Sequence, residues 1–103
     1  MTTAVMDLKA VTIVIWDTLD AMFPKVRFAG VTVKPDTSFY GDPILWIDAY
    51  YDGPDDALSG RAMNMAVGEA RQRLASIGCD DFPIFSYVST QEKKPPRAAR
   101  RLP

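Results

Sequence analysis

The chain has 103 residues, of which 48 % are hydrophobic and 24 % are charged, and it contains one cysteine and no histidine. This composition is typical of one globular domain and excludes a disordered chain. A single cysteine excludes an internal disulfide and a thiolate metal cluster, and the lack of histidine removes Cys-His and Ser-His catalysis and histidine-type zinc sites. We therefore expect a non-enzymatic protein with no metal and no cofactor.

Charge is distributed unevenly along the sequence. Residues 1–90 carry seven basic and twelve acidic side chains, a formal charge of −5, whereas residues 91–103 carry five basic and one acidic, a formal charge of +4. We interpret 1–90 as a single α+β domain and 91–103 as a basic Pro/Arg-rich tail. Such a tail is either a solvated extension or an arm that binds an acidic protein surface or a nucleic acid.

The N-terminal residues show no targeting pattern. They lack the basic start of a signal peptide, and Asp7 and Lys9 interrupt the apolar stretch. The uninterrupted apolar run Ile13–Trp16 is far shorter than a membrane span. We expect a cytoplasmic protein with no membrane partner.

Apolar residues at helical spacing predict a helix over residues 4–23. Its stripe consists of Leu8, Val11, Ile15, Leu19 and Met22. Thr2 or Thr3 would cap its start, and Pro24 would end it, because proline disfavours a helical conformation in the residue before it. Residues 11–16 are also rich in β-branched side chains, so a strand is the alternative for this stretch.

Alternating apolar residues predict strands over 25–35 and 44–52, and the turn-rich connection between them favours an antiparallel hairpin. In the first strand, one face would hold Ala29, Val31 and Val33, and the other Phe28, Gly30, Thr32 and Lys34. In the second, one face would hold Leu45, Ile47, Ala49 and Tyr51, and the other Ile44, Trp46, Asp48, Tyr50 and Asp52.

The segment Asp52–Asp56 predicts the start of a second helix, because its proline and acidic residues suit a first turn. Ser59 and Gly60 mark the point where that first turn would separate as a short piece. The helix would run to about Ile77, and Gly78 suits a left-handed cap at its C-terminal end. A third strand is predicted over 82–89.

The predicted order is α-β-β-α-β, a small α+β sandwich in which two helices cover one face of a three-stranded sheet. The other face would expose Phe28, Ile44, Trp46 and Tyr50, with Phe85 and Tyr87 as further candidates. Monomers rarely expose a contiguous apolar patch much above roughly 300–600 Å². The sequence therefore favours a protein-interaction module: a homodimer, a partner-binding regulator of antitoxin or immunity type, or an assembly subunit.

The predicted partner-binding residues are aromatic, since tryptophan and tyrosine are enriched at the hot spots of interfaces. They are Trp46, Tyr50, Phe28 and Trp16. A third and weaker reading is a small-molecule pocket beside Asp48, Tyr50 and Cys79.

The alternative function is an RNA- or ribosome-associated protein that uses its basic tail together with Arg71 and Arg73. The tail residues concerned are Lys93, Lys94, Arg97, Arg100 and Arg101. The element order resembles that of type II KH-like domains, and the likeness is confined to that order. The G-x-x-G loop of RNA-binding KH domains is missing at the entry to the second helix, where the acidic segment Asp52–Asp56 would repel a phosphate backbone.

Overall fold

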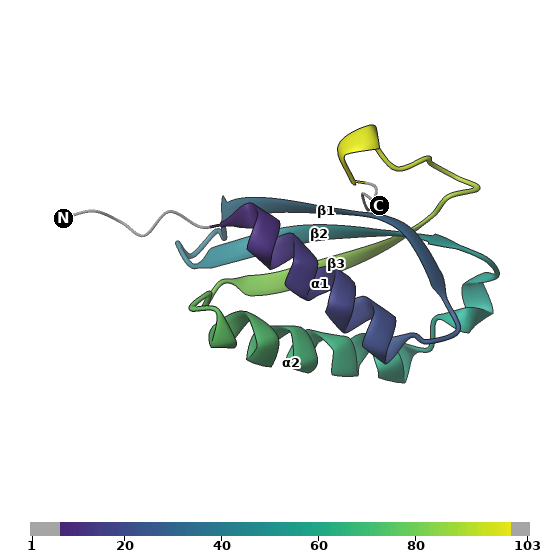
Figure 1. Ribbon diagram of the computed structural model, residues 1–103. Helices are drawn as coiled ribbons and strands as arrows, with labels where there is room; N and C mark the ends of the chain where they lie inside the picture. The colour runs from purple at the N-terminus through teal and green to yellow at the C-terminus, as the bar shows by residue number, and fades with distance from the viewer. Residues whose placement is uncertain (1–6, 100–103) are drawn as a thin grey trace.

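The computed structural model describes residues 7–99, which form two α-helices packed on one face of a three-stranded sheet (Figure 1). The elements are α1 (Leu8–Met22), β1 (Arg27–Thr37), β2 (Pro43–Asp52), η1 (Asp55–Ala57), α2 (Gly60–Ser76), β3 (Phe82–Ser89) and η2 (Arg97–Ala99), of which η1 and η2 are single turns of 3-10 helix. This arrangement confirms the predicted α+β fold and the order α-β-β-α-β.

The helix reading of residues 11–16 is confirmed, because this stretch lies inside α1. Thr2 and Thr3, the predicted caps, lie outside the described residues. Instead the Asp7 carboxylate accepts hydrogen bonds from the backbone N–H groups of Lys9 and Ala10, at 3.1 and 3.2 Å. These bonds satisfy two of the donors that the first turn of a helix leaves unpaired.

The second helix begins later than Asp52–Asp56 suggests, with that segment leading into the separate turn η1. Ser59 caps α2, and its hydroxyl accepts a hydrogen bond from the Ala62 N–H at 3.0 Å. At the other end Gly78 adopts a φ of +80°, and the Cys79 N–H donates to the Leu74 carbonyl at 2.9 Å. The predicted break at Ser59 and the left-handed cap at Gly78 are therefore both confirmed.

The sheet is mixed. β1 and β2 pair antiparallel as predicted, and β2 and β3 pair parallel because α2 returns the chain to the end where β2 began. Consequently the start of β3 lies at the same end of the sheet as the β1–β2 hairpin loop, which we call the hairpin end. The strand order β1-β2-β3 leaves β2 in the centre.

The core lies between the helices and the sheet. On the central strand, Leu45, Ile47 and Ala49 are fully buried, which confirms the predicted inner face of β2. They pack in one cluster with residues of both helices, among them Val11, Ile15, Leu19, Ala66, Ala70 and Leu74. The face of the sheet opposite the helices is called the outer face below.

Three aromatic residues predicted on the outer face lie on the inner face instead. A β-bulge between Phe28 and Gly30 inserts one extra residue into β1, so that Phe28 pairs with Tyr51 and joins the core. Phe85 and Tyr87 pair with Ile47 and Ala49 in the parallel register, and they also pack against the core. The predicted outward orientation of these three side chains is wrong, because alternation alone cannot locate a bulge or a register.

The segment after β3 folds back across the outer face toward β1 (Figure 1). It is tied to the end of β2 by a bond from the Thr90 N–H to the Tyr51 carbonyl at 3.0 Å, and the Thr90 hydroxyl donates to the Asp52 carboxylate. Pro95 then packs against Gly30, where an added Cβ would lie only 2.7 Å from the Pro95 Cβ. One half of the outer face is thereby covered by residues 90–99, and we call the rest its open half.

Candidate protein-interaction surface

The open half of the outer face carries three apolar side chains that we call the outer patch: Trp46, Phe82 and Ile84. Trp46 on β2 pairs with Ile84 on β3. Phe82, two residues before Ile84 on the same face of β3, pairs with Ile44. Side chains at such positions on neighbouring strands lie on one face and in reach of one another. Trp46 and Phe82 are each 43 % exposed. The outer patch therefore leaves aromatic surface in contact with water.

The indole of Trp46 is held in a defined orientation. Its Nε1–H donates a hydrogen bond of 2.9 Å to the Asp36 carboxylate, which also accepts one from the Thr37 N–H at 2.7 Å. The bond from Trp46 is the largest cause of a lowered pKa of Asp36, followed by the bond from Thr37. Because the charged carboxylate is the better acceptor, the ionised Asp36 keeps the ring fixed on the sheet.

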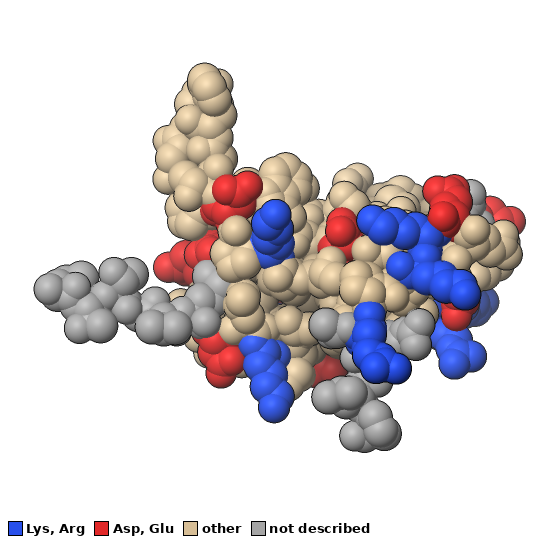
Figure 2. Space-filling model, turned by 90° about the horizontal axis from the view of Figure 1, so that it is seen from above, with Lys and Arg blue, Asp and Glu red and all other residues tan. Residues whose placement is uncertain are grey.

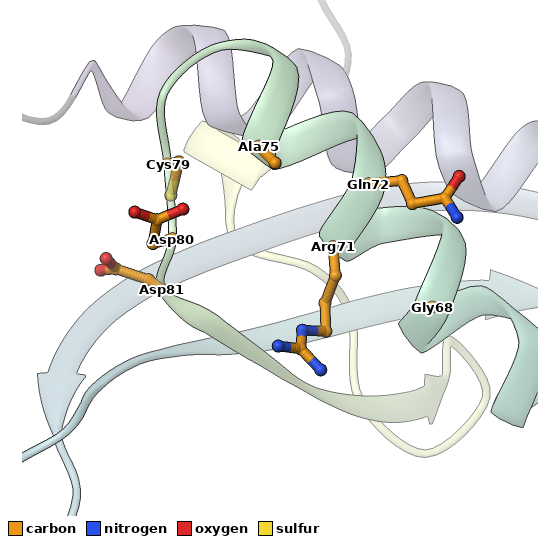
Figure 3. A pocket seen from close by; sticks show the side chains of 7 residues that line it. All are labelled: Gly68, Arg71, Gln72, Ala75, Cys79, Asp80 and Asp81. Atoms are coloured by element: carbon orange, nitrogen blue, oxygen red, sulfur yellow. The ribbon is translucent and has the colours of Figure 1, made fainter.

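Phe82 is held by a contact from the helix layer. The guanidinium carbon of Arg71 lies 5.0 Å from the centroid of the Phe82 ring, within the range of a cation–π interaction. Figure 3 shows the Arg71 side chain extending from α2 toward β3, across a hollow of about 360 Å³. The hollow is lined by Gly68, Arg71, Gln72, Ala75, Cys79, Asp80 and Asp81.

This hollow has little of the chemistry that a nucleophilic site requires. Burial is the main cause of a raised pKa of the Cys79 thiol, with a smaller contribution from the charges of Asp81 and Asp80. A thiol is reactive as the thiolate, and the neighbouring carboxylates oppose its formation. We therefore interpret Cys79 as part of the core.

The hairpin loop presents two aromatic rings that the sequence analysis missed. Phe39 and Tyr40 are 96 % and 87 % exposed, and their ring centroids lie 5.4 Å apart in a T-shaped arrangement. The turn below them is closed by bonds from the Ser38 N–H to the Asp42 carbonyl and from the Gly41 N–H to the Ser38 carbonyl, at 2.8 and 2.9 Å. Figure 2 shows an uncharged projection at the hairpin end. The available signal was two consecutive aromatic residues inside a run of turn residues.

The four predicted partner-binding residues do not form one surface. Trp16 and Phe28 are each 7 % exposed and belong to the core on the helix side of the sheet. Tyr50 is 2 % exposed on the outer face, where it pairs with Gly30 in the half that residues 90–99 cover. Trp46 alone of the four has a side chain substantially exposed to solvent.

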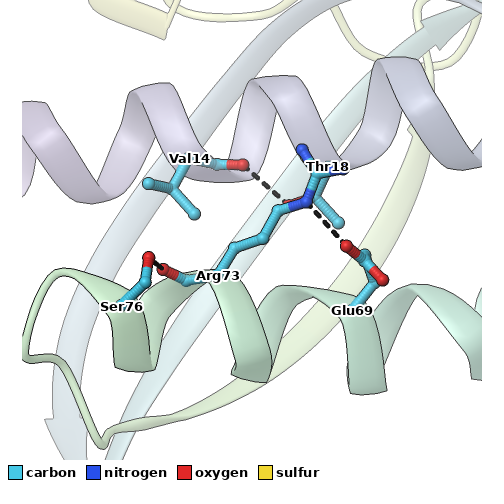
Figure 4. A network of polar contacts seen from close by, with 5 residues as sticks. All are labelled: Val14, Thr18, Glu69, Arg73 and Ser76. Atoms are coloured by element: carbon cyan, nitrogen blue, oxygen red, sulfur yellow. Dashed lines mark hydrogen bonds and ion pairs between the residues drawn. The ribbon is translucent and has the colours of Figure 1, made fainter.

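The basic residues of the C-terminal segment lie at the end of the molecule opposite the hairpin. Lys93, Lys94 and Arg97 are exposed, and Figure 2 shows several Lys and Arg side chains at this end, with Asp and Glu side chains among them. Arg100 and Arg101 lie outside the described residues. The helix arginines predicted to act with them are engaged elsewhere: Arg71 contacts Phe82, and Arg73 forms a 2.8 Å ion pair with Glu69 (Figure 4).

The residues predicted to line a small-molecule pocket are separated by the sheet. Asp48 and Tyr50 lie on the outer face, whereas Cys79 packs in the core on the opposite side. Within residues 7–99, no group of three or more His, Cys, Asp and Glu side chains is placed to hold a metal ion. No helix in the same residues is long and apolar enough to cross a membrane.

Three comparisons with known proteins found no relative of this chain. The chain matches no protein-family model, no curated protein and no solved structure.

Proposed function

We propose that this protein is a non-enzymatic interaction module that binds a protein partner at the hairpin end of its outer face. The observation that carries the proposal is the pair Phe39 and Tyr40, 96 % and 87 % exposed on a closed turn beside the outer patch. Burying one large aromatic side chain contributes roughly 1.5–3 kcal/mol. Leaving two such rings in water is a cost that a partner would remove.

The rings are also prepared for binding. The hydrogen bond to Asp36 orients Trp46, the cation–π contact orients Phe82, and the two turn bonds restrict the backbone below Phe39 and Tyr40. Side chains that are already ordered lose less conformational freedom on association, so more of the contact energy appears as affinity. Ordered aromatic anchors of this kind are the usual hot spots of protein interfaces.

The proposal is tested by capture of partners from the native lysate with tagged full-length protein. One variant carries Phe39→Ser and Tyr40→Ser, and a second carries Trp46→Ala. The matched control carries Ile13→Ala and Met65→Ala, which remove exposed apolar side chains from the helices. We expect the first two variants to lose the partner and the control to keep it, with unchanged circular dichroism in all three. Retention of the partner by both aromatic variants would refute the surface.

The alternative function is binding of RNA or ribosomes through the basic end. The exposed side chains of Lys93, Lys94 and Arg97 support it. Three phosphate contacts to a single strand predict a slope of roughly −2 when log affinity is plotted against log salt concentration. A captured partner that disappears on nuclease treatment, with a salt slope of this size, would favour the alternative over a protein partner. A flat salt response would contradict it.

A further inference from the structure

We infer that the partner of the outer face is a second copy of this chain, packed antiparallel to the first. In this arrangement the basic C-terminal segment of each copy lies against the open half of the other copy's outer face. The inference deepens the proposed function and rests on it, because it uses the same aromatic surface. Two features of the outer face carry it, namely its charge distribution and its relief.

The charges of the outer face have opposite signs at its two ends. The open half and its hairpin loop contain Asp36, Asp42, Asp48 and Lys34, a net charge of −2. In the covered half, the strand residues and residues 90–99 include Arg27, Asp52, Glu92, Lys93, Lys94 and Arg97, a net charge of +2, and the acidic turn η1 follows the end of β2. β1 spans eleven residues between these ends, or roughly 35 Å at about 3.3 Å per residue. Over that length, Asp36 and Asp42 near the hairpin end are largely screened from the cations at the other end.

The two halves of the outer face also differ in height, and the higher half is the basic one. Residues 90–99 lie on top of the sheet over Gly30 and Tyr50, so the basic half is raised. The open half, which holds Trp46 and Phe82, lacks this extra layer. A two-fold axis through the middle of the face places the raised basic half of one copy over the lower acidic half of its partner. The contact is then the same in both directions and closes as a dimer.

This combination favours a second copy over an unrelated partner. Here the surface is complementary to itself in both charge and height. The same packing would also cover Trp46 and Phe82 in both copies, so the aromatic surface of the outer patch would no longer be exposed to water.

The inference is tested by sedimentation equilibrium of the full chain, using charge reversal. One variant carries Lys93→Glu and Lys94→Glu, and a second carries Asp42→Lys and Asp48→Lys. The matched control, Lys9→Glu with Arg61→Glu, makes the same change in net charge at exposed helix positions as the first variant. Close charge pairs across an interface are worth tenfold or more in affinity. We therefore expect each outer-face variant to weaken the homodimer about tenfold or more at low salt, and the control to leave it unchanged.

Mixing the two outer-face variants tests directly whether opposite charges on two copies hold the dimer together. The Lys93→Glu, Lys94→Glu variant has acidic side chains at both sites, and the Asp42→Lys, Asp48→Lys variant has basic side chains at both. Every contact between the two variants therefore joins opposite charges, and we expect a heterodimer as tight as the native homodimer. Equal weakening by the control variant, or no heterodimer on mixing, would overturn the inference. A monomer at every soluble concentration would also overturn it. If that monomer still captured a different protein, and the capture was lost with Phe39→Ser and Tyr40→Ser or with Trp46→Ala, the proposed function would stand without this inference. If capture survived both aromatic variants, both would fail.

Discussion

Replacing Gly30 with alanine tests whether the C-terminal segment is packed on the sheet in solution. An added Cβ at this position would lie 2.7 Å from the Pro95 Cβ and 3.2 Å from the Ala99 carbonyl oxygen. The first distance is too short for two carbon atoms in contact, and the second involves backbone that cannot rotate away. The methyl group therefore fits only if residues 95–99 move off the strand.

The size of the effect follows from two opposing contributions. Inserting a methyl group into a packed site costs typically about 1–3 kcal/mol. Alanine also restricts the unfolded chain more than glycine does, which returns about 0.4–1 kcal/mol where the backbone conformation is compatible. We expect the free energy of unfolding of Gly30→Ala to fall by about 1–2 kcal/mol. For a domain of this size, that corresponds to a decrease of about 5–10 °C in Tm.

The assay combines urea denaturation with limited trypsin digestion after Lys93 and Arg97, since Pro95 blocks cleavage after Lys94. The matched control is Gly68→Ala, where nothing lies within 4 Å of the added Cβ. Because Gly68 is inside α2, this control should raise stability by up to about 1 kcal/mol. Trypsin should cut Gly30→Ala faster than the native chain. The decrease in the free energy of unfolding caused by Gly30→Ala should be smaller when the chain also carries Pro95→Gly. Native stability and native cleavage rates for Gly30→Ala would refute the packing of this segment against β1.

Two further predictions concern titrating groups. Burial raises the pKa of Tyr87 to about 12 from an ordinary value of 10.0, and its hydroxyl finds no partner among the described residues. Between pH 10 and about pH 12 the unfolded chain loses the Tyr87 proton while the folded chain keeps it, so the free energy of unfolding decreases as pH rises through this range. Tyr87→Phe should flatten this alkaline loss in urea denaturation and gain up to about 1 kcal/mol at pH 7; lower stability at pH 7 would show that the hydroxyl is bonded. The pKa of Asp36 lies below 3.8, chiefly because of the Trp46 bond, so its contribution is present above pH 3.8 and is lost as pH falls through that lowered value. The indole ¹⁵N–¹H signal of Trp46 should titrate with a midpoint below 3.8 and lose this titration in Asp36→Asn; a midpoint at or above 3.8 would contradict the bond.

Local features of the fold were predictable because their causes are local. A period of two placed Leu45, Ile47 and Ala49 on one face of β2, and the core of a sheet covered on one side demands that pattern. Gly78 follows the last helical turn, where a left-handed conformation is needed and glycine adopts it without strain. The break before α2 followed from Ser59, a residue type that caps helices through its hydroxyl.

The candidate surface was only partly predictable, because its residues depend on contacts between distant parts of the chain. Trp46 was recognised on the outer face, but Tyr50, four residues later on the same face, is covered by a segment that begins about forty residues further on. The exposure of Phe39 and Tyr40 could not be deduced from a loop composition that also fits a loop folded onto the sheet. Whether an aromatic side chain is buried is decided by what packs on it.

By itself, the sequence determined the order of the helices and strands, which face of β2 packs on the helices and how α2 ends, since each depends on hydrogen bonding and side-chain periodicity within a few residues. The tertiary structure alone decided three further features: the bulge that turns Phe28 into the core, the parallel pairing that brings Phe82 beside the hairpin end, and the packing of Pro95 on Gly30. Each of these joins residues that are distant in sequence or shifts the register between two strands. Their energies come from pairwise contacts in space, which the periodicity of a single segment does not record.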